Sequence, residues 1–147
     1  MRAVLLAAVA LLAACGKEPP KAPPAAAEVV FTAKDGSFSA RLPAAWRVDE
    51  TRLEGSGAAF FGPPDGPRPY SQMITVSFKA STAPPPVGVI TDELTLPGPK
   101  GALVRLTVRR AAAPAPGGYY ALEYSVPAGD EPLPAWDAFR AGFKALR

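Results

Sequence analysis

Residues 29–42 read VVFTAKDGSFSARL, and this stretch decides the fold class. Asp35-Gly36 is the strongest short signal for a β-hairpin when alternating apolar residues flank it. Every second residue on both sides is apolar: Val29, Phe31, Ala33, Phe38, Ala40 and Leu42. A two-residue turn at Asp35-Gly36 pairs Phe31 with Ala40, which puts both apolar sets on one face of the hairpin. The sequence therefore predicts two antiparallel strands that turn one face toward a core.

Further strands follow along the chain, each marked by apolar residues at every second position. The prolines at 84, 85, 86, 97 and 99 are too closely spaced for a long helix over 80–100. We expect that segment to be mostly loop. The expected extended segments are 46–48, 57–61, 72–79, a short strand near 90–96, 102–110 and 120–126.

The last two of these strands form a hairpin whose register decides what the outer face of the sheet carries. Their apolar sets must share one side of the sheet, because the opposite arrangement buries charge. With residues 111–117 in the connecting loop, the predicted pairs are Val108 with Tyr120, Leu106 with Leu122, and Val104 with Tyr124. The predicted outer face then sets Arg105 opposite Glu123 and Arg109 opposite Tyr119.

Four basic residues would follow that outer face: Lys79, Arg105, Arg109 and Arg110. A mildly basic face of this kind could contact anionic lipid or a protein partner. An ordinary solvated face is the alternative interpretation.

The chain closes with a predicted amphipathic helix that begins near Pro134, a residue tolerated in a first helical turn. Its apolar residues are spaced by three and four positions: Trp136, Phe139, Phe143 and Leu146. Strands closed by one such helix indicate an α+β domain, in which an antiparallel β-sheet packs against the C-terminal helix. We expect residues 29–147 to form this single domain.

The N-terminus has the composition of an export signal. The first 14 residues contain 13 apolar residues and one charge, Arg2. The apolar run over 3–14 is too short to cross a bilayer and has the length of a signal-peptide core. We predict that residues 1–14 are a secretion signal.

Leu12-Ala13-Ala14-Cys15 resembles the lipobox of bacterial lipoproteins. The resemblance implies cleavage between Ala14 and Cys15, and acyl chains on Cys15 that anchor the protein to a membrane. Two or more chains, at about 0.8 kcal/mol per buried methylene, anchor a protein almost permanently. Gly16 replaces the Asp that retains such proteins at the inner membrane of enteric bacteria. The resemblance therefore favours the periplasmic face of an outer membrane, and a buried core cysteine is the alternative.

Residues 15–28 comprise this cysteine and a proline-rich tether. The tether, GKEPPKAPPAAAE, has no apolar periodicity, which excludes a core element. In polyproline II geometry it would reach about 40 Å, enough to hold a domain clear of lipid headgroups. One PxxP, formed by Pro20 and Pro23, leaves a ligand for an SH3-like groove as the alternative.

A second resemblance lies within the folded region. Asp35-Gly36-Ser37-Phe38, followed by Leu42-Pro43 and Trp46, resembles the opening of PsbP-like domains, and 139–146 resembles their last helix. The resemblance implies docking to a larger membrane complex. Such domains usually carry a central helix, where this chain has the proline-rich residues 80–100.

Composition excludes several classes of function. The chain has no histidine and one cysteine, so it cannot form a His/Cys zinc site, a Ser-His-Asp triad or an internal disulfide. Without Arg2, the 16 basic residues become 15, against 13 acidic ones, which is too balanced for a nucleic-acid binder. We expect no cofactor and no metal.

Two functions remain open. The first is a lipid-anchored envelope protein that binds or assembles with an envelope protein or complex and has no catalytic residues. The alternative is a hydrolase of envelope polymers that uses carboxylates, which requires two inward-facing acids in one pocket. Its candidate acids are Asp49, Glu50, Glu54, Asp92, Glu93, Asp130 and Glu131. We interpret the following aromatic residues as core, with a sugar or peptide groove as the alternative: Trp46, Phe60, Phe61, Tyr119 and Tyr120.

Overall fold

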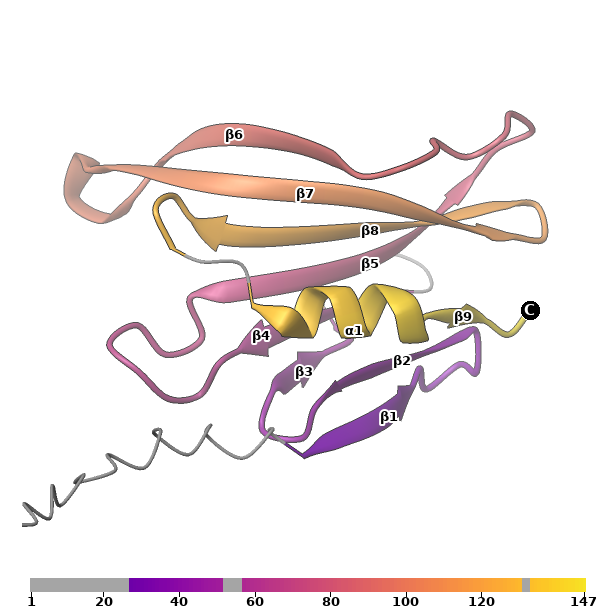
Figure 1. Ribbon diagram of the computed structural model, residues 1–147. Helices are drawn as coiled ribbons and strands as arrows, with labels where there is room; N and C mark the ends of the chain where they lie inside the picture. The colour runs from indigo at the N-terminus through magenta and orange to yellow at the C-terminus, as the bar shows by residue number, and fades with distance from the viewer. Residues whose placement is uncertain (1–26, 52–56, 131–132) are drawn as a thin grey trace, which may run out of the picture.

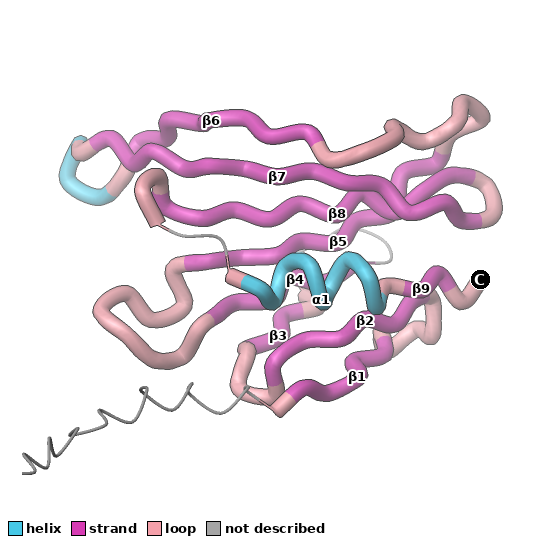
Figure 2. The backbone as a smooth tube through the Cα atoms, viewed as in Figure 1, coloured by secondary structure: helices cyan, strands magenta, loops and turns pink. Residues whose placement is uncertain are grey.

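The computed structural model describes residues 27–51, 57–130 and 133–147. It is mostly antiparallel β-sheet with one short α-helix near the C-terminus (Figure 1; Figure 2). The three-stranded sheet has the order β1-β2-β9, and the six-stranded sheet has the order β3-β4-β5-β8-β7-β6. The strands are β1 (Glu28–Thr32), β2 (Phe38–Pro43), β3 (Arg47–Asp49), β4 (Gly57–Gly62), β5 (Gln72–Ala80), β6 (Ile90–Pro97), β7 (Leu103–Ala115), β8 (Gly118–Pro127) and β9 (Lys144–Ala145). The helix α1 spans Pro134–Gly142, and a 3-10 turn spans Pro99–Gly101.

The first hairpin has the predicted register. Phe31 pairs with Ala40, and the apolar residues of β2 are buried. Its turn differs from the prediction, because the N–H of Gly36 donates to the carbonyl of Ala33 at 2.8 Å. The Asp35 carboxylate accepts from the N–H of Ser37 at 3.0 Å. The strands are therefore joined by a longer loop than the two-residue turn, and the loop leaves the register unchanged.

The C-terminal helix is shorter than predicted. Trp136 and Phe139 are buried on α1 as expected, but the helix ends at Gly142. The chain then extends as β9, where Ala145 pairs with Phe38 of β2. Leu146 is 52% exposed, so its assignment to a buried helical stripe is wrong. The extended backbone there pairs with β2, which satisfies polar groups of that strand that a longer helix would leave without partners.

The core lies between the two sheets and α1. The Trp136 ring stacks on Tyr124 of β8, with centroids 5.6 Å apart and an interplanar angle of 13°. Phe139 meets Phe60 of β4 edge to face at 5.0 Å. Phe143, although not helical, stacks on Phe38 at 5.4 Å. The buried side of the helix thus joins strands from both sheets into one core.

The predicted register of β7 and β8 is wrong. Residues 111–117 do not form the connecting loop, since β7 continues to Ala115, which pairs with Gly118 of β8. A two-residue turn, Pro116-Gly117, joins the strands, and Gly117 has φ 75°, a conformation that favours glycine. As a result, Val108 pairs with Ser125 and not with Tyr120.

This shift amounts to five residues and moves the β7 side chains to the opposite face of the sheet from the predicted one. A shift by an odd number moves each side chain to the other side of the sheet. We call the side that carries Tyr120, Leu122 and Tyr124 the core face, and the opposite side the outer face. Small residues of β7, Ala111 and Ala113, pair with Leu122 and Tyr120 on the core face.

Candidate interaction surface

The outer face carries apolar side chains where β6 and β7 pair. Leu94 pairs with Leu106, and Leu96 pairs with Val104. These four residues form the outer apolar stripe. Leu94, Leu96 and Val104 are 36%, 45% and 37% exposed. Exposed apolar side chains clustered in this way mark interaction sites more often than isolated ones do.

The stripe lies beside an open edge of the sheet. In the part of the chain that the structure describes, β6 pairs with β7 on one side and with no strand on the other. All eight residues of β6 are exposed, and Figure 1 shows β6 as the outermost strand of the larger sheet. An exposed edge offers backbone N–H and carbonyl groups for pairing with another chain. The predicted short strand near 90–96 is thus confirmed, at a position where it can form an interface.

An ion-pair cluster lies next to the stripe on the outer face. The Arg110 Nε donates to the Glu123 carboxylate at 2.7 Å, and its Nη1 bonds to Asp92 of β6. The hydrogen bond with Glu123 raises the pKa of Arg110 above its ordinary value, and the charge of Asp92 acts in the same direction. Arg110 therefore ties β6, β7 and β8 together, and its single positive charge is shared between two carboxylates.

The four predicted basic residues do not form one face. Arg109 and Arg110 are neighbours on β7, so their side chains point to opposite sides of the sheet. The Arg105 guanidinium forms an ion pair with Glu93 of β6 at 2.8 Å, and not with Glu123. Lys79 of β5 lies opposite Tyr119 of β8. The predicted outer-face pair of Arg105 and Glu123 is wrong, and the basic contact face that depended on it is not formed.

Arg109 instead lies opposite Tyr124 on the core face. Burial raises the pKa of the Tyr124 hydroxyl above its ordinary value. That hydroxyl donates to the Gln72 side chain and accepts from the N–H of Leu133 at 3.1 Å. Leu133 precedes α1, so this buried contact positions the start of the helix.

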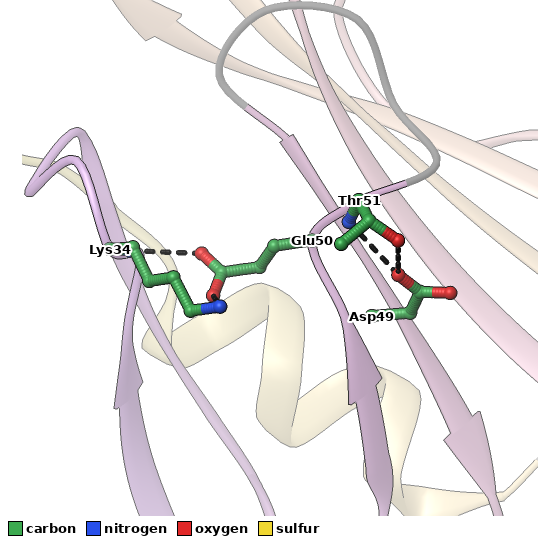
Figure 3. A network of polar contacts seen from close by, with 4 residues as sticks. All are labelled: Lys34, Asp49, Glu50 and Thr51. Carbon is green, nitrogen blue, oxygen red and sulfur yellow. Dashed lines mark hydrogen bonds and ion pairs between the residues drawn. The ribbon is translucent and has the colours of Figure 1, made fainter.

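Two of the acids that follow Trp46, Asp49 and Glu50, are held in structural contacts (Figure 3). The Glu50 carboxylate accepts from the backbone N–H of Lys34 at 2.9 Å, and the Lys34 ammonium lies 3.7 Å away. Asp49 accepts from both the N–H and the hydroxyl of Thr51 at 2.9 and 2.6 Å. The Glu50 contacts link the first hairpin to the segment after β3, whereas the Asp49 hydrogen bonds are local to that segment. Glu54 and Glu131 lie outside the described residues.

A groove of about 490 Å³ lies near the start of the described chain. Its lining is mainly apolar and includes Trp46, Pro63 and Leu133. Its lining also includes two acidic residues, Glu28 and Asp65, both of which are exposed to solvent. The groove therefore gives no support to the hydrolase alternative.

The aromatic residues divide between core and surface. Trp46, Phe60 and Tyr120 are buried, as the core interpretation predicts. Tyr119 and Phe61 are partly exposed. Tyr119 borders a hollow of about 150 Å³ on the outer face, which is smaller than usual ligand pockets.

Cys15 and Ala14 lie outside the described residues, so the predicted lipidation and cleavage stay predictions. Within 27–51, 57–130 and 133–147, no helix is long and apolar enough to cross a membrane. The same ranges hold no cluster of three or more side chains suited to bind a metal ion.

No protein-family model, curated protein or solved structure matches this chain. Sequence reasoning missed the outer apolar stripe because it assigned Val104 and Leu106 to the core. The signal that could have found it is the run of alanines ending in Pro116-Gly117, which favours a tight turn.

Proposed function

We propose that this protein is a lipid-anchored envelope protein that binds a partner through the outer apolar stripe and has no catalytic activity. The single observation that carries the proposal is the exposure of Leu94, Leu96 and Val104 beside the unpaired edge of β6. Burying such side chains against a partner would contribute about 25 cal/mol per Å² of apolar surface. Edge pairing would add backbone hydrogen bonds and fix the orientation of the partner.

Membrane anchoring through acyl chains on Cys15 is the second element of the proposal. The lipobox resemblance supports it, together with the proline-rich tether that follows. The proposed location is extracytoplasmic, at the periplasmic face of the outer membrane in a host with two membranes. The tether would hold the domain clear of the headgroups and leave β6 accessible to a partner.

The fold class belongs to the same proposal. We place the domain among α+β proteins on the packing of α1 against the sheets. The PsbP-like resemblance, and the docking to a membrane complex that it implies, stays a prediction. Residues 90–97 form a strand where such domains usually have a helix.

A capture experiment tests the proposed function. The tagged full chain is purified from detergent-solubilised membranes, and its bound proteins are compared with those of an L94K/L96K variant. We expect the variant to lose the bound proteins, because lysine at these positions places charge in an apolar interface. Val30→Lys is the matched control, since Val30 is 68% exposed on β1, in the other sheet. Equal capture by wild type and L94K/L96K would contradict the proposal.

A further inference from the structure

We propose that the partner seated on the edge of β6 is a second copy of this chain, with the two β6 strands paired antiparallel about a two-fold axis. This inference rests on the proposed function, because it names the partner of the outer apolar stripe. The two six-stranded sheets would join into one continuous sheet. Symmetric interfaces of this kind use the same surface on both copies.

Apolar and polar side chains alternate along β6, so two antiparallel copies of the strand can place apolar residues opposite one another. A two-fold axis perpendicular to the sheet keeps the outer faces of both copies on the same side. With Thr95 opposite Thr95 of the second copy, Leu94 lies opposite Leu96, and the same pair recurs across the axis. Cross-strand apolar pairs stabilise a sheet directly. The two outer apolar stripes would then form one continuous apolar surface with leucines of both copies in contact at its centre.

The charges of β6 are compatible with this register. Asp92 and Glu93 are the acidic residues of the strand, and each is already paired within its own chain, with Arg110 and Arg105 respectively. In the proposed register Asp92 lies opposite Gly98 of the second copy. The two Asp92 side chains are therefore six residues apart along the strands, about 20 Å at 3.3 Å per residue. At that distance salt screens most of their repulsion.

The acidic residues also discriminate between registers. Shifting the strands by four residues places Glu93 opposite Glu93 of the second copy, which is destabilising because like charges then lie directly opposite. The Thr95-centred register avoids this pairing and places leucine against leucine. Thus charge and apolar complementarity favour the same arrangement.

Cysteine cross-linking tests this arrangement directly. The chain has one native cysteine, so the full chain carrying Cys15→Ser provides a thiol-free background. Directly opposed residues of antiparallel strands have Cα atoms about 4.5–5.5 Å apart, within the range that a disulfide spans. Thr95→Cys in this background should therefore form a covalent dimer under mild oxidation in detergent, and reductant should reverse it.

Thr91→Cys is the matched control, because it lies on the same strand and the same face. In the proposed register the two Thr91 positions are eight residues apart, about 26 Å, beyond the reach of a disulfide. We expect the Thr91→Cys chain to stay monomeric on a non-reducing gel. Equal cross-linking of both variants, or none with Thr95→Cys, would overturn the inference.

Sedimentation of the Cys15→Ser chain in the same detergent gives an independent measurement. The mass should correspond to two chains, and Leu96→Lys should weaken dimerisation at least tenfold, because symmetry places the substituted residue in the interface twice. Val30→Lys should leave the dimer unchanged. A monomer at all concentrations would overturn the second-copy inference. It would leave the proposed function standing if the capture experiment still depends on Leu94 and Leu96.

Discussion

Arg110 of β7 lies directly opposite Glu123 of β8, and its Nε donates a 2.7 Å hydrogen bond to that carboxylate. The sequence-based register had placed Arg105 in this position, five residues away. The observed pair therefore reports which of two registers the hairpin adopts. The register in turn decides whether Leu106 and Val104 lie on the core face or on the outer face of the sheet.

A double-mutant cycle measures the coupling free energy between Arg110 and Glu123. Arg110→Met and Glu123→Gln, singly and together, should show a coupling of about 0.3–1 kcal/mol in the free energy of unfolding, as partly exposed ion pairs do. The equivalent cycle of Arg105→Met with Glu123→Gln should give none, since Arg105 bonds to Glu93. Urea denaturation provides the measurement. Coupling confined to Arg105 would restore the rejected register.

The buried Tyr124 hydroxyl predicts a second effect. Tyr124→Phe removes a donor to Gln72 and an acceptor for the N–H of Leu133. We expect a loss of about 1–3 kcal/mol in unfolding free energy, because buried polar groups are left without partners. Hydrogen exchange should rise first at the start of α1. Unchanged stability and exchange would show that this contact does not position the helix.

Alkaline pH provides a third test. Burial holds the pKa of Tyr124 above its ordinary value of 10.0, so the folded protein keeps a proton that the unfolded chain releases. Stability from this group is complete below about pH 10 and is lost as the pH rises through the folded pKa. Denaturation curves measured between pH 8 and 11 should show that the free energy of unfolding falls as the pH rises, and that this fall is smaller in Tyr124→Phe. Parallel curves for both proteins would contradict this.

Gly62 predicts a fourth effect, through its close approach to Trp46. A β-carbon on Gly62 would lie 2.1 Å from the indole ring, so Gly62→Ala must displace the Trp46 side chain. Overpacking of this kind costs about 1–3 kcal/mol. In a Trp46→Leu background the same substitution should cost much less. Additive effects of the two changes in thermal unfolding would refute the contact.

The elements of the fold were predictable where local pattern and turn chemistry agree. Asp35-Gly36 lies between two alternating segments, and the register of that hairpin is confirmed. The strand over 72–79 is confirmed as well, with Ile74 and Val76 buried. In both cases the polar or charged residues on the other face oppose a one-residue shift, which would bury them.

The β7–β8 register was not predictable from the same reasoning. The alanines at 111 and 113 are small enough to pack under large core residues, yet they carry little signal in an apolar pattern. They were assigned to a loop, and the tight Pro116-Gly117 turn was thereby missed. The outer apolar stripe followed from that turn, so the candidate surface could be recognised only in the fold.

The proposed lipid anchor is tested most directly by the mass of the N-terminal peptide of the protein recovered from membranes. The account predicts that the mature chain begins at Cys15, with a mass increase equal to a diacylglyceryl group and its acyl chains. Cys15→Ser should remain an unprocessed precursor without lipid. A mature protein that retains residues 1–14, or that carries a free thiol at Cys15, would contradict the proposed lipid anchor.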